Sequence, residues 1–365
     1  MIKNLLENFS PENNSILWLT SAFILAFFIA FRTFPTIIYI SNRKHLMDEP
    51  DSRSMHSKRT PTLGGIGIFF SLVVVMTITG AMLNTKVMLL VMGGITILFF
   101  LGLKDDLTVL SPRSKFLGQI FAALLLIVFT DTRIIGLSSI LDVYTLPYWV
   151  SIGFTLFVYI LIINAYNLID GVDGLAGSIA LLISIVFSVL FYNTGALSLA
   201  TISVALIGAL VAFLRFNFSS KNKIFMGDTG SMILGFLIAF FTISFISESQ
   251  LDANSSFYRA SPALALSMLF YPLMDTFRIF FIRIFVLKKS PFEADRNHIH
   301  HRFIQSGYTH VQTTLTIVLI NLIIIIIAFN MLHLNLNTQI GVLFLYGSLL
   351  YYLPFLLKRR INKTP

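Results

Sequence analysis

Apolar stretches of membrane-spanning length recur along the whole of this 365-residue chain, and they restrict its fold more than any other feature. A helix needs about 20 apolar residues to cross a bilayer, and in lipid its backbone polar groups must be bonded within the segment. We therefore predict an all-α, polytopic helical bundle with about eleven transmembrane helices. The segments are Ile16–Ile40, Gly64–Met82, Val87–Leu103, Phe116–Phe129, Tyr148–Ile163, Leu175–Tyr192, Leu197–Phe213, Met232–Ile246, Pro262–Phe285, Leu315–Leu332 and Ile340–Leu357.

Composition agrees with a chain that resides in a bilayer. Charged residues make up 12% of the chain, against about 25% in soluble domains. The absence of cysteine excludes disulfides, thiolate metal sites and a cysteine nucleophile. The first apolar stretch is too long for a signal-peptide core and has no cleavage pattern, so we expect it to be retained. Residues 1–365 are predicted to form a single membrane-embedded domain.

The basic residues indicate how the helices are oriented. When the loops are assigned to alternate sides, twenty of the 26 Lys and Arg residues fall on one side. The other side holds only Lys3, Lys86, Arg133 and Arg259, and two more lie inside segments. Because cytoplasmic loops are enriched in Lys and Arg, we predict the N-terminus outside and the C-terminus in the cytoplasm. The net charge of +9 is then a topology signal, so no nucleic-acid partner is expected.

A pair of carboxylates, Asp105 and Asp106, ends the third segment on the predicted cytoplasmic side. Adjacent carboxylates at a membrane boundary repel each other unless a cation neutralises them. The alternative for this pair alone is a solvated loop start beside Lys104. The pair is therefore a candidate for binding a cation.

A second acidic motif lies in the loop 164–174. Asn164, Asn167, Asp170 and Asp173 recur at every third position, so a helical start would align them on one side. The loop contains no Lys or Arg, which indicates that a metal supplies its counter-charge. It lacks the spacing and the terminal Glu of a calcium-binding EF-hand, and an ordinary turn rich in Asn and Asp is the alternative.

The third motif places Asp228 between glycines, just ahead of a predicted helix. Glycines and a helix N-terminus bind anions, and Asp228 can complete a magnesium site whose other ligands are phosphate oxygens. The Asp-Thr-Gly triplet also occurs in aspartic proteases, but those are all-β proteins.

A fourth motif groups His298, His300 and His301 with Arg302. We favour phosphate or nucleotide binding here, because arginine suits an anionic partner; zinc binding and a solvated loop are the alternatives. The first cytoplasmic loop adds further cations, among them Lys58 and Arg59. Carboxylates for a divalent ion and cations for phosphates, all at headgroup depth, are what phosphoryl transfer from a nucleotide to a lipid phosphate needs.

These motifs resemble, in their order and spacing, those of the polyprenyl-phosphate N-acetylhexosamine-1-phosphate transferases (glycosyltransferase family 4). The resemblance runs from about Asp48 to Arg302 and is strongest with the bacterial undecaprenyl-phosphate N-acetylglucosamine-1-phosphate transferases. The form His-Ile-His-His at 298–301 is that of the N-acetylglucosamine branch, since relatives that transfer muramoyl-pentapeptide phosphate usually carry three consecutive histidines. One departure is Val109, where the family often has a third acidic residue, which leaves the role of the Asp-Asp pair open.

The resemblance implies transfer of N-acetylglucosamine-1-phosphate, or a related N-acetylhexosamine-1-phosphate, from a UDP-sugar to undecaprenyl phosphate. UMP would be released and a lipid-linked cell-surface glycan begun, at the cytoplasmic face of a bacterial inner membrane. The implied cofactor is Mg²⁺, with Mn²⁺ as a substitute, and the other partners are membrane lipids; a homodimer is left open.

The implied roles distribute over the motifs. Mg²⁺ would be held by Asp228 with help from Asp173 or Asp170, and Asp105 or Asp106 would deprotonate or orient the lipid phosphate. The histidines and Arg302 would hold the nucleotide, and the two loop asparagines with Lys58 and Arg59 would bind substrate. A covalent aspartyl intermediate is the competing mechanism.

Two other classes of protein compete with the enzyme. A secondary transporter would also combine many helices with carboxylates, but its acids lie near the membrane midplane, often with repeat symmetry. Here only Asp275, close to Arg278, lies clearly within a segment. A non-catalytic scaffold would not need several polar motifs on one side.

Overall fold

The helices predicted from hydropathy are present, and the first shows how the sequence sets its limits. The computed structural model describes residues 11, 13–48, 60–83, 85–108, 110–137, 143–251, 257–289 and 298–361, without the side chains of 48, 353 and 356–361. Helix α2 (Ser15–Lys44) begins after Asn14, whose side chain accepts a hydrogen bond from the Leu17 amide. Two basic residues occupy its last turn, where the helix dipole favours positive charge.

Helices make up nearly all the regular structure of these residues. Two short strands, β1 (Met47–Asp48) and β2 (Thr60–Pro61), pair antiparallel. The other elements are α3 (Gly64–Leu83), α4 (Lys86–Thr108), α5 (Pro112–Thr130), α6 (Tyr148–Ile169), α7 (Leu175–Asn193), α8 (Leu197–Asn217), α9 (Gly227–Leu251), α10 (Ser261–Met268), α11 (Phe270–Phe281), the π-helix η2 (Ile282–Val286), α12 (Ile299–Gln305), α13 (His310–Asn330) and α14 (Leu336–Ile361).

Within the described residues, nine helices are long and apolar enough to cross a membrane. Aromatic and aliphatic side chains project outward from several of them, as in a protein whose surroundings are lipid; Phe28, Phe121 and Trp149 are each more than half exposed. The chain is thus an all-α, polytopic membrane protein. The total of eleven spans and the positions of the termini remain predictions.

The predicted segment Pro262–Phe285 is not one continuous helix, and that prediction is corrected here. The helical pattern is interrupted at Leu269, between α10 and α11. Pro272 has no N–H to donate to the carbonyl of Met268. Instead, the Asn321 side chain on α13 donates to that carbonyl at 3.0 Å and accepts from the Tyr271 amide at 3.1 Å.

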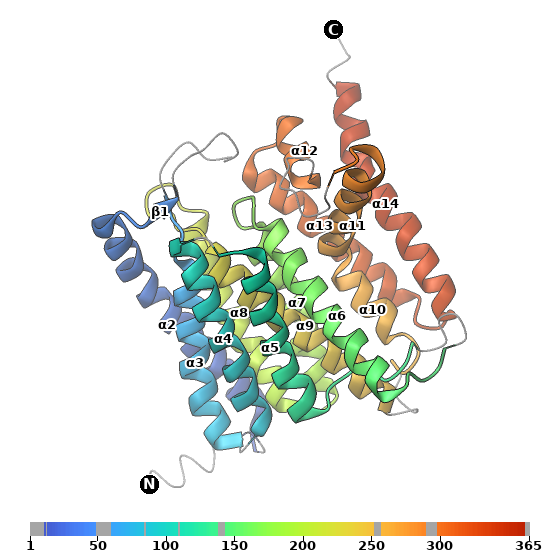
Figure 1. Cartoon of the computed structure of the whole chain (residues 1–365), viewed down its shortest axis with the longest axis horizontal. Coiled ribbons are helices and arrows are strands. Elements are labelled where there is room, and N and C mark those ends of the chain that lie inside the picture. The colour runs from blue at the N-terminus through green and yellow to red at the C-terminus, as the bar shows by residue number, and fades with distance from the viewer. Residues whose placement is uncertain are drawn as a thin grey trace. The chain divides into compact units, whose positions relative to one another are not determined.

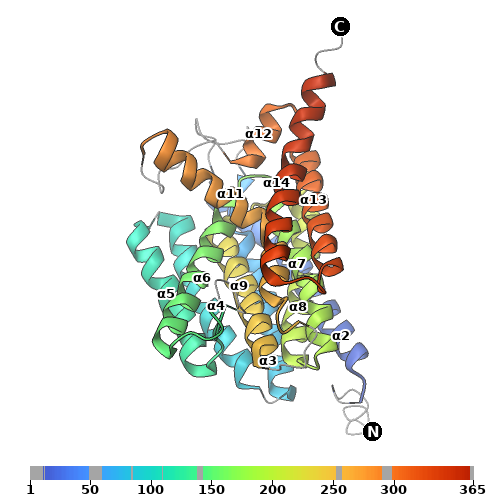
Figure 2. The same ribbon diagram turned by 90° about the vertical axis from the view of Figure 1, so that its right-hand side faces the viewer.

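The described residues divide into two compact units that interleave in sequence. The first takes the residues up to Thr132 with Leu156–Asp170 and Ala176–Phe241, and the second takes Arg133–Thr155, Gly171–Leu175 and the residues from Thr242 on. In the first unit, α2 packs against α3 and α8, and α4 contacts both α3 and α5 (Figure 1). In the second unit, α13 and α14 lie side by side (Figure 2), and both contact α10.

Candidate active site

The third sequence motif forms the N-terminus of α9, and glycines let neighbouring backbones approach it closely. Gly227 has φ of +72°, in the left-handed region, and a Cβ there would also collide with the Thr62 carbonyl. A Cβ on Gly102 of α4 would collide with the backbone of Thr229. These contacts hold the end of α4 directly against the first turn of α9.

Main-chain hydrogen bonds fix the start of α3 and strand β2 to the segment before α9. The amides of Gly64 and Gly65 donate to the carbonyls of Phe225 and Met226 at 2.9 and 2.8 Å. The Phe225 amide donates to the Pro61 carbonyl at 2.7 Å. This pairing could not be inferred from side-chain chemistry, because only backbone atoms make it.

Asp106 caps the N-terminus of α9. Its two carboxylate oxygens accept from the backbone amides of Asp228 and Thr229 at 2.7 and 3.1 Å, and from the Thr229 hydroxyl at 2.5 Å. The first amides of a helix have no partner within the helix, and the positive end of the helix dipole favours a carboxylate there. Asp106 therefore organises the loop that carries Asp228.

Asp105 and Asp228 meet at the ammonium group of Lys115 on α5. Lys115 Nζ lies 2.8 Å from Asp228 Oδ2 and also pairs with Asp105 Oδ2. Asp105 is buried, with 3% of its side chain exposed, whereas about a third of Asp228 is exposed. Asn167 donates to Asp228 Oδ1 at 2.8 Å. We call Asp105, Asp106, Lys115, Asn167 and Asp228 the carboxylate cluster.

The sequence reasoning counted Lys115 only as a topology signal and missed its place in this cluster. Ser111 caps α5 after a short connection from α4, so Lys115 lies in the first turns of the next helix. That short spacing from Asp105 was the available signal. Of the adjacent carboxylates, Asp105 pairs with a cation that the protein supplies, and Asp106 bonds to the start of α9.

The motif 164–174 was predicted as a loop, but its residues up to Ile169 form the last turns of α6, and the motif contributes residues to both units. Asn164 is exposed and donates to Gln119 Oε1 at 2.8 Å, in the first unit. Asp170, half-buried, is the last residue of that unit before Gly171. In the second unit, Asp173 Oδ2 lies 3.1 Å from His310 Nδ1.

The histidine motif is anchored by a buried carboxylate that sequence reasoning did not connect with it. Asp275 of α11, fully buried, accepts from the Ile299 amide at 2.8 Å, and its other oxygen lies 2.8 Å from His298 Nδ1. His300 Nδ1 lies 3.1 Å from the Tyr271 hydroxyl. We call Asp275, Tyr271, His298 and His300 the histidine cluster.

Burial lowers the pKa of His300 to about 3, so its imidazole is neutral at physiological pH. A Cβ on Gly171 would lie 3.0 Å from His300 Nε2, which ties the second sequence motif to the fourth within the second unit. His300 is thus a packed, uncharged residue. By contrast, Arg302 is exposed, with its guanidinium 6.0 Å from the centre of the Phe355 ring.

The zinc alternative gains a third ligand in this structure. Asp275, His298 and His300 offer ligand atoms within 4.8 Å of one another, and they are the one such group among the described residues. Their atoms already hydrogen-bond to one another and to Tyr271, which accounts for the cluster without an ion. Lys58, Arg59 and Val109 lie outside the described residues.

Comparison with known proteins decides the family. A probable undecaprenyl-phosphate N-acetylglucosaminyl 1-phosphate transferase of Bacillus subtilis (strain 168) is 31% identical over 311 residues, covering 83% of this chain and 82% of that protein. A family model described as Glycosyl transferase family 4 matches residues 88–246. The chain belongs to glycosyl transferase family 4.

Other members of glycosyl transferase family 4 are similar over much of their length. A decaprenyl-phosphate N-acetylglucosaminephosphotransferase of Mycobacterium tuberculosis (strain CDC 1551 / Oshkosh) is 32% identical, over 77% of this chain and 74% of that protein. An undecaprenyl-phosphate alpha-N-acetylglucosaminyl 1-phosphate transferase of Escherichia coli (strain K12) is 28% identical, over 77% and 75%. Residues 88–246 of this chain, which the family model matches, contain the whole carboxylate cluster. The histidine cluster lies beyond them.

Proposed function

We propose that this protein transfers N-acetylglucosamine-1-phosphate from a UDP-sugar to undecaprenyl phosphate and releases UMP. Membership of glycosyl transferase family 4 and the names of its relatives support the reaction. The structural observation that carries the proposal is the meeting of Asp105, Asp228 and Lys115 at the ends of three helices. A lipid-linked product would begin a cell-surface glycan.

The donor atoms of the carboxylate cluster fit a divalent ion. Mg²⁺ prefers carboxylate oxygens and usually keeps several waters and phosphate oxygens as its other ligands. Asp105 and Asp228 already direct oxygens at one cationic group, and Asp228 remains partly exposed. We propose that Asp228 holds Mg²⁺, or Mn²⁺ as a substitute, with Asp105 beside it and with help from Asp170 or Asp173. When bound, the ion would supply positive charge to the pyrophosphate.

Side chains of the protein would orient the substrates and balance their charge during the transfer. An oxygen of the lipid phosphate attacks the phosphorus that carries the sugar, and the bond from that phosphorus to the uridylyl phosphate breaks. Asp105 is proposed to orient the attacking phosphate through the Lys115 ammonium group, which it shares with Asp228, whereas Asp106 bonds to the start of α9 with both oxygens. Asn167 holds the Asp228 carboxylate in place. Lys115 balances the negative charge.

In the second unit, we propose that His301 and Arg302 bind the nucleotide of the UDP-sugar. His298 and His300 would keep the motif in position, since both are buried and hydrogen-bonded. A His301→Ala variant should bind the UDP-sugar more weakly. Unchanged affinity would assign the motif a structural role.

The reaction can be tested with purified protein, radiolabelled UDP-N-acetylglucosamine and undecaprenyl phosphate. We expect lipid-linked sugar and UMP in equal amounts, dependence on Mg²⁺ and inhibition by tunicamycin. Asp228→Asn should abolish the metal-dependent reaction while the protein stays inserted and folded. Parallel reactions with other UDP-N-acetylhexosamines would identify the sugar. Failure to form lipid-linked product from any of them would overturn the proposal.

We further propose that the carboxylate cluster faces the cytoplasm of a bacterial inner membrane. The distribution of Lys and Arg supports this orientation. Because the chain contains no cysteine, single cysteines can be introduced and labelled without background. A cysteine at Lys86 should react with an impermeant maleimide in intact cells, and one at Lys221 only after the membrane is opened. The reverse pattern would invert the proposed topology.

A further inference from the structure

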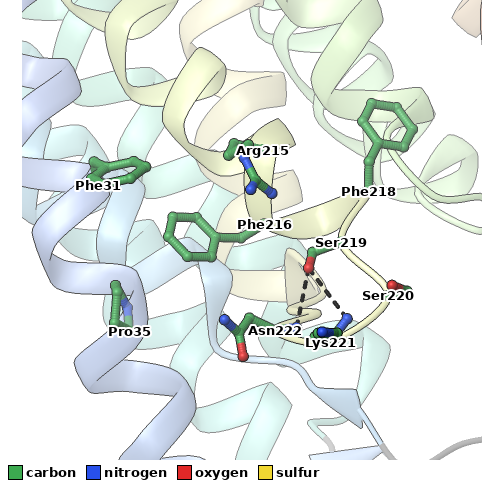
Figure 3. Close-up of a pocket in the computed structure, with 9 residues that line it drawn as sticks. All are labelled: Phe31, Pro35, Arg215, Phe216, Phe218, Ser219, Ser220, Lys221 and Asn222. Carbon is green, nitrogen blue, oxygen red and sulfur yellow. Dashed lines mark hydrogen bonds between the residues drawn. The ribbon is translucent and has the colours of Figure 1, made fainter.

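A cavity of about 610 Å³ opens in the first unit between α2 and the end of α8. Figure 3 shows Phe31 and Pro35 of α2 on one side, and Arg215 and Phe216 of α8 with the loop that follows on the other. None of these residues belongs to the carboxylate cluster. The cavity is therefore separate from the carboxylate cluster.

The cavity lies where a membrane-spanning helix leaves the apolar region. Arg215 is in the last turn of α8, and Lys221 lies in the connection that leads on to α9. On the α2 side, Phe28, Phe31 and Tyr39 are 56%, 36% and 62% exposed, as expected of side chains that face lipid. Of these, the tyrosine is of the kind that collects at the level of the headgroups.

The cations at this cavity have no acidic partner in the described part of the chain. Arg215 and Lys221 are both exposed, and neither forms an ion pair with a described carboxylate. No Asp or Glu occurs between Asp173 and Asp228. The helix dipole accounts for a cation at the end of α8, but it explains neither Lys221 nor the hollow beside it.

The loop that carries Lys221 is held in a defined shape. Ser219 Oγ accepts from the amides of Lys221 and Asn222 at 3.3 and 3.1 Å, as the dashed lines in Figure 3 mark. Asn217 donates to the Ile224 carbonyl at 2.8 Å and closes the turn. The bonded turn therefore presents Lys221, and the last turn of α8 presents Arg215, at the same cavity as the aromatic side chains.

We propose that this cavity binds an anionic glycerophospholipid, with its phosphate at Arg215 and Lys221 and its glycerol and upper acyl chains against Phe31 and Phe216. Charge complementarity favours an anionic headgroup, and the apolar wall favours a lipid over a free anion. This lipid is distinct from the acceptor of the transfer reaction. It would tether the connection before Asp228 to the membrane surface.

Native mass spectrometry of delipidated protein in detergent provides the test. The protein should retain phosphatidylglycerol in preference to phosphatidylcholine with the same acyl chains. An Arg215→Gln/Lys221→Gln variant should lose about 25-fold in affinity for phosphatidylglycerol, because each cation near an anionic lipid contributes about fivefold. Lys86→Gln/Arg259→Gln removes the same charge elsewhere and should bind like the wild type. Equal retention by both double variants would overturn the proposal.

Competition separates the possible occupants. Neither undecaprenyl phosphate nor inorganic phosphate should displace phosphatidylglycerol from the cavity, and the Arg215→Gln/Lys221→Gln variant should still bind undecaprenyl phosphate. Displacement by inorganic phosphate would show a free-anion site, and loss of undecaprenyl phosphate binding would assign the cavity to the acceptor; either result overturns the proposal. Lys221→Gln alone changes one exposed side chain, and its smaller loss of lipid affinity checks that folding is not the cause.

Discussion

Asp106 binds the backbone amide of Asp228 at 2.7 Å and makes no bond to its side chain. Asp106 is thus the cap of the helix whose first turn contains Asp228. Asp105, which precedes Asp106 in the sequence, is the residue that shares the Lys115 cation with Asp228. The adjacent acids have different tasks because Asp106 bonds to the backbone at the start of α9, whereas Asp105 pairs with the side chain of Lys115 on α5.

Asp106→Ala should lower the stability of the protein. Three hydrogen bonds to the start of α9 would be lost, at a cost of about 1.5–3 kcal/mol for each bond to a charged acceptor. Thermal unfolding in detergent measures the change. Asp106→Asn keeps one acceptor oxygen, and its melting temperature should lie between those of Asp106→Ala and the wild type. A wild-type melting temperature for Asp106→Ala would contradict the capping role.

Lys115→Met should make the protein depend on divalent ions for stability. Without the ammonium group, Asp105 and Asp228 repel each other, at a cost of about 1–3 kcal/mol. Adding Mg²⁺ should raise the melting temperature of the variant more than that of the wild type. If Mg²⁺ shifts both equally, Lys115 does not share the position of the ion.

Gly102→Ala should disturb the cluster through packing alone. The added Cβ would lie 2.7 Å from the Thr229 amide nitrogen, and relief of such a clash costs about 1–3 kcal/mol. Gly153→Ala is the matched control, since a Cβ on that α6 glycine meets nothing within 4 Å. The control should gain about 0.5–1 kcal/mol from helix propensity. Relative to the wild type, the melting temperature should fall for Gly102→Ala and rise for Gly153→Ala.

Asp275 and His298 should be energetically coupled. Removal of either leaves the other buried without its 2.8 Å partner, so the double variant should cost less than the sum of the single alanine variants. We expect a coupling of about 1–3 kcal/mol in a double-mutant cycle. Strict additivity would show that this contact does not hold the histidine motif.

Acid should destabilise the protein through His300. Its pKa is about 3 in the folded state and near 6.5 when unfolded, so the unfolded chain binds more protons between these values. The contribution of His300 is fully present above pH 6.5 and is lost as the pH falls, by about 1.4 kcal/mol per unit. The melting temperature of His300→Gln should therefore decline less than that of the wild type from pH 6.5 to 4.5. Parallel declines would argue against a buried, neutral imidazole.

Hydropathy predicted the helices because a segment that crosses lipid must be predominantly apolar along its whole length. It failed at Leu269, where Asn321, 53 positions from Met268, satisfies the groups that the break releases. A pattern confined to one segment carries no information about such a partner.

The candidate site was predictable where its residues are unusual for their position. Asp105, Asp106 and Asp228 stood out because acids are rare at the ends of apolar segments, and the structure brings them together. Lys115 did not stand out, because a lysine near a membrane boundary is common, and Asp275 stood out as an acid within a segment but gave no indication of its partner. Their partners, Asp228 and His298, lie 113 and 23 residues away.

The pairing of Gly64 and Gly65 with Phe225 and Met226 uses amides and carbonyls, which every amino acid except proline supplies in full. Replacement of Phe225 or Met226 by alanine would therefore leave these hydrogen bonds intact. Proline, or an insertion or deletion that shifts the register, would break these bonds directly, whereas any side chain added at Gly64 or Gly65 would disrupt them by collision of its Cβ with the facing backbone.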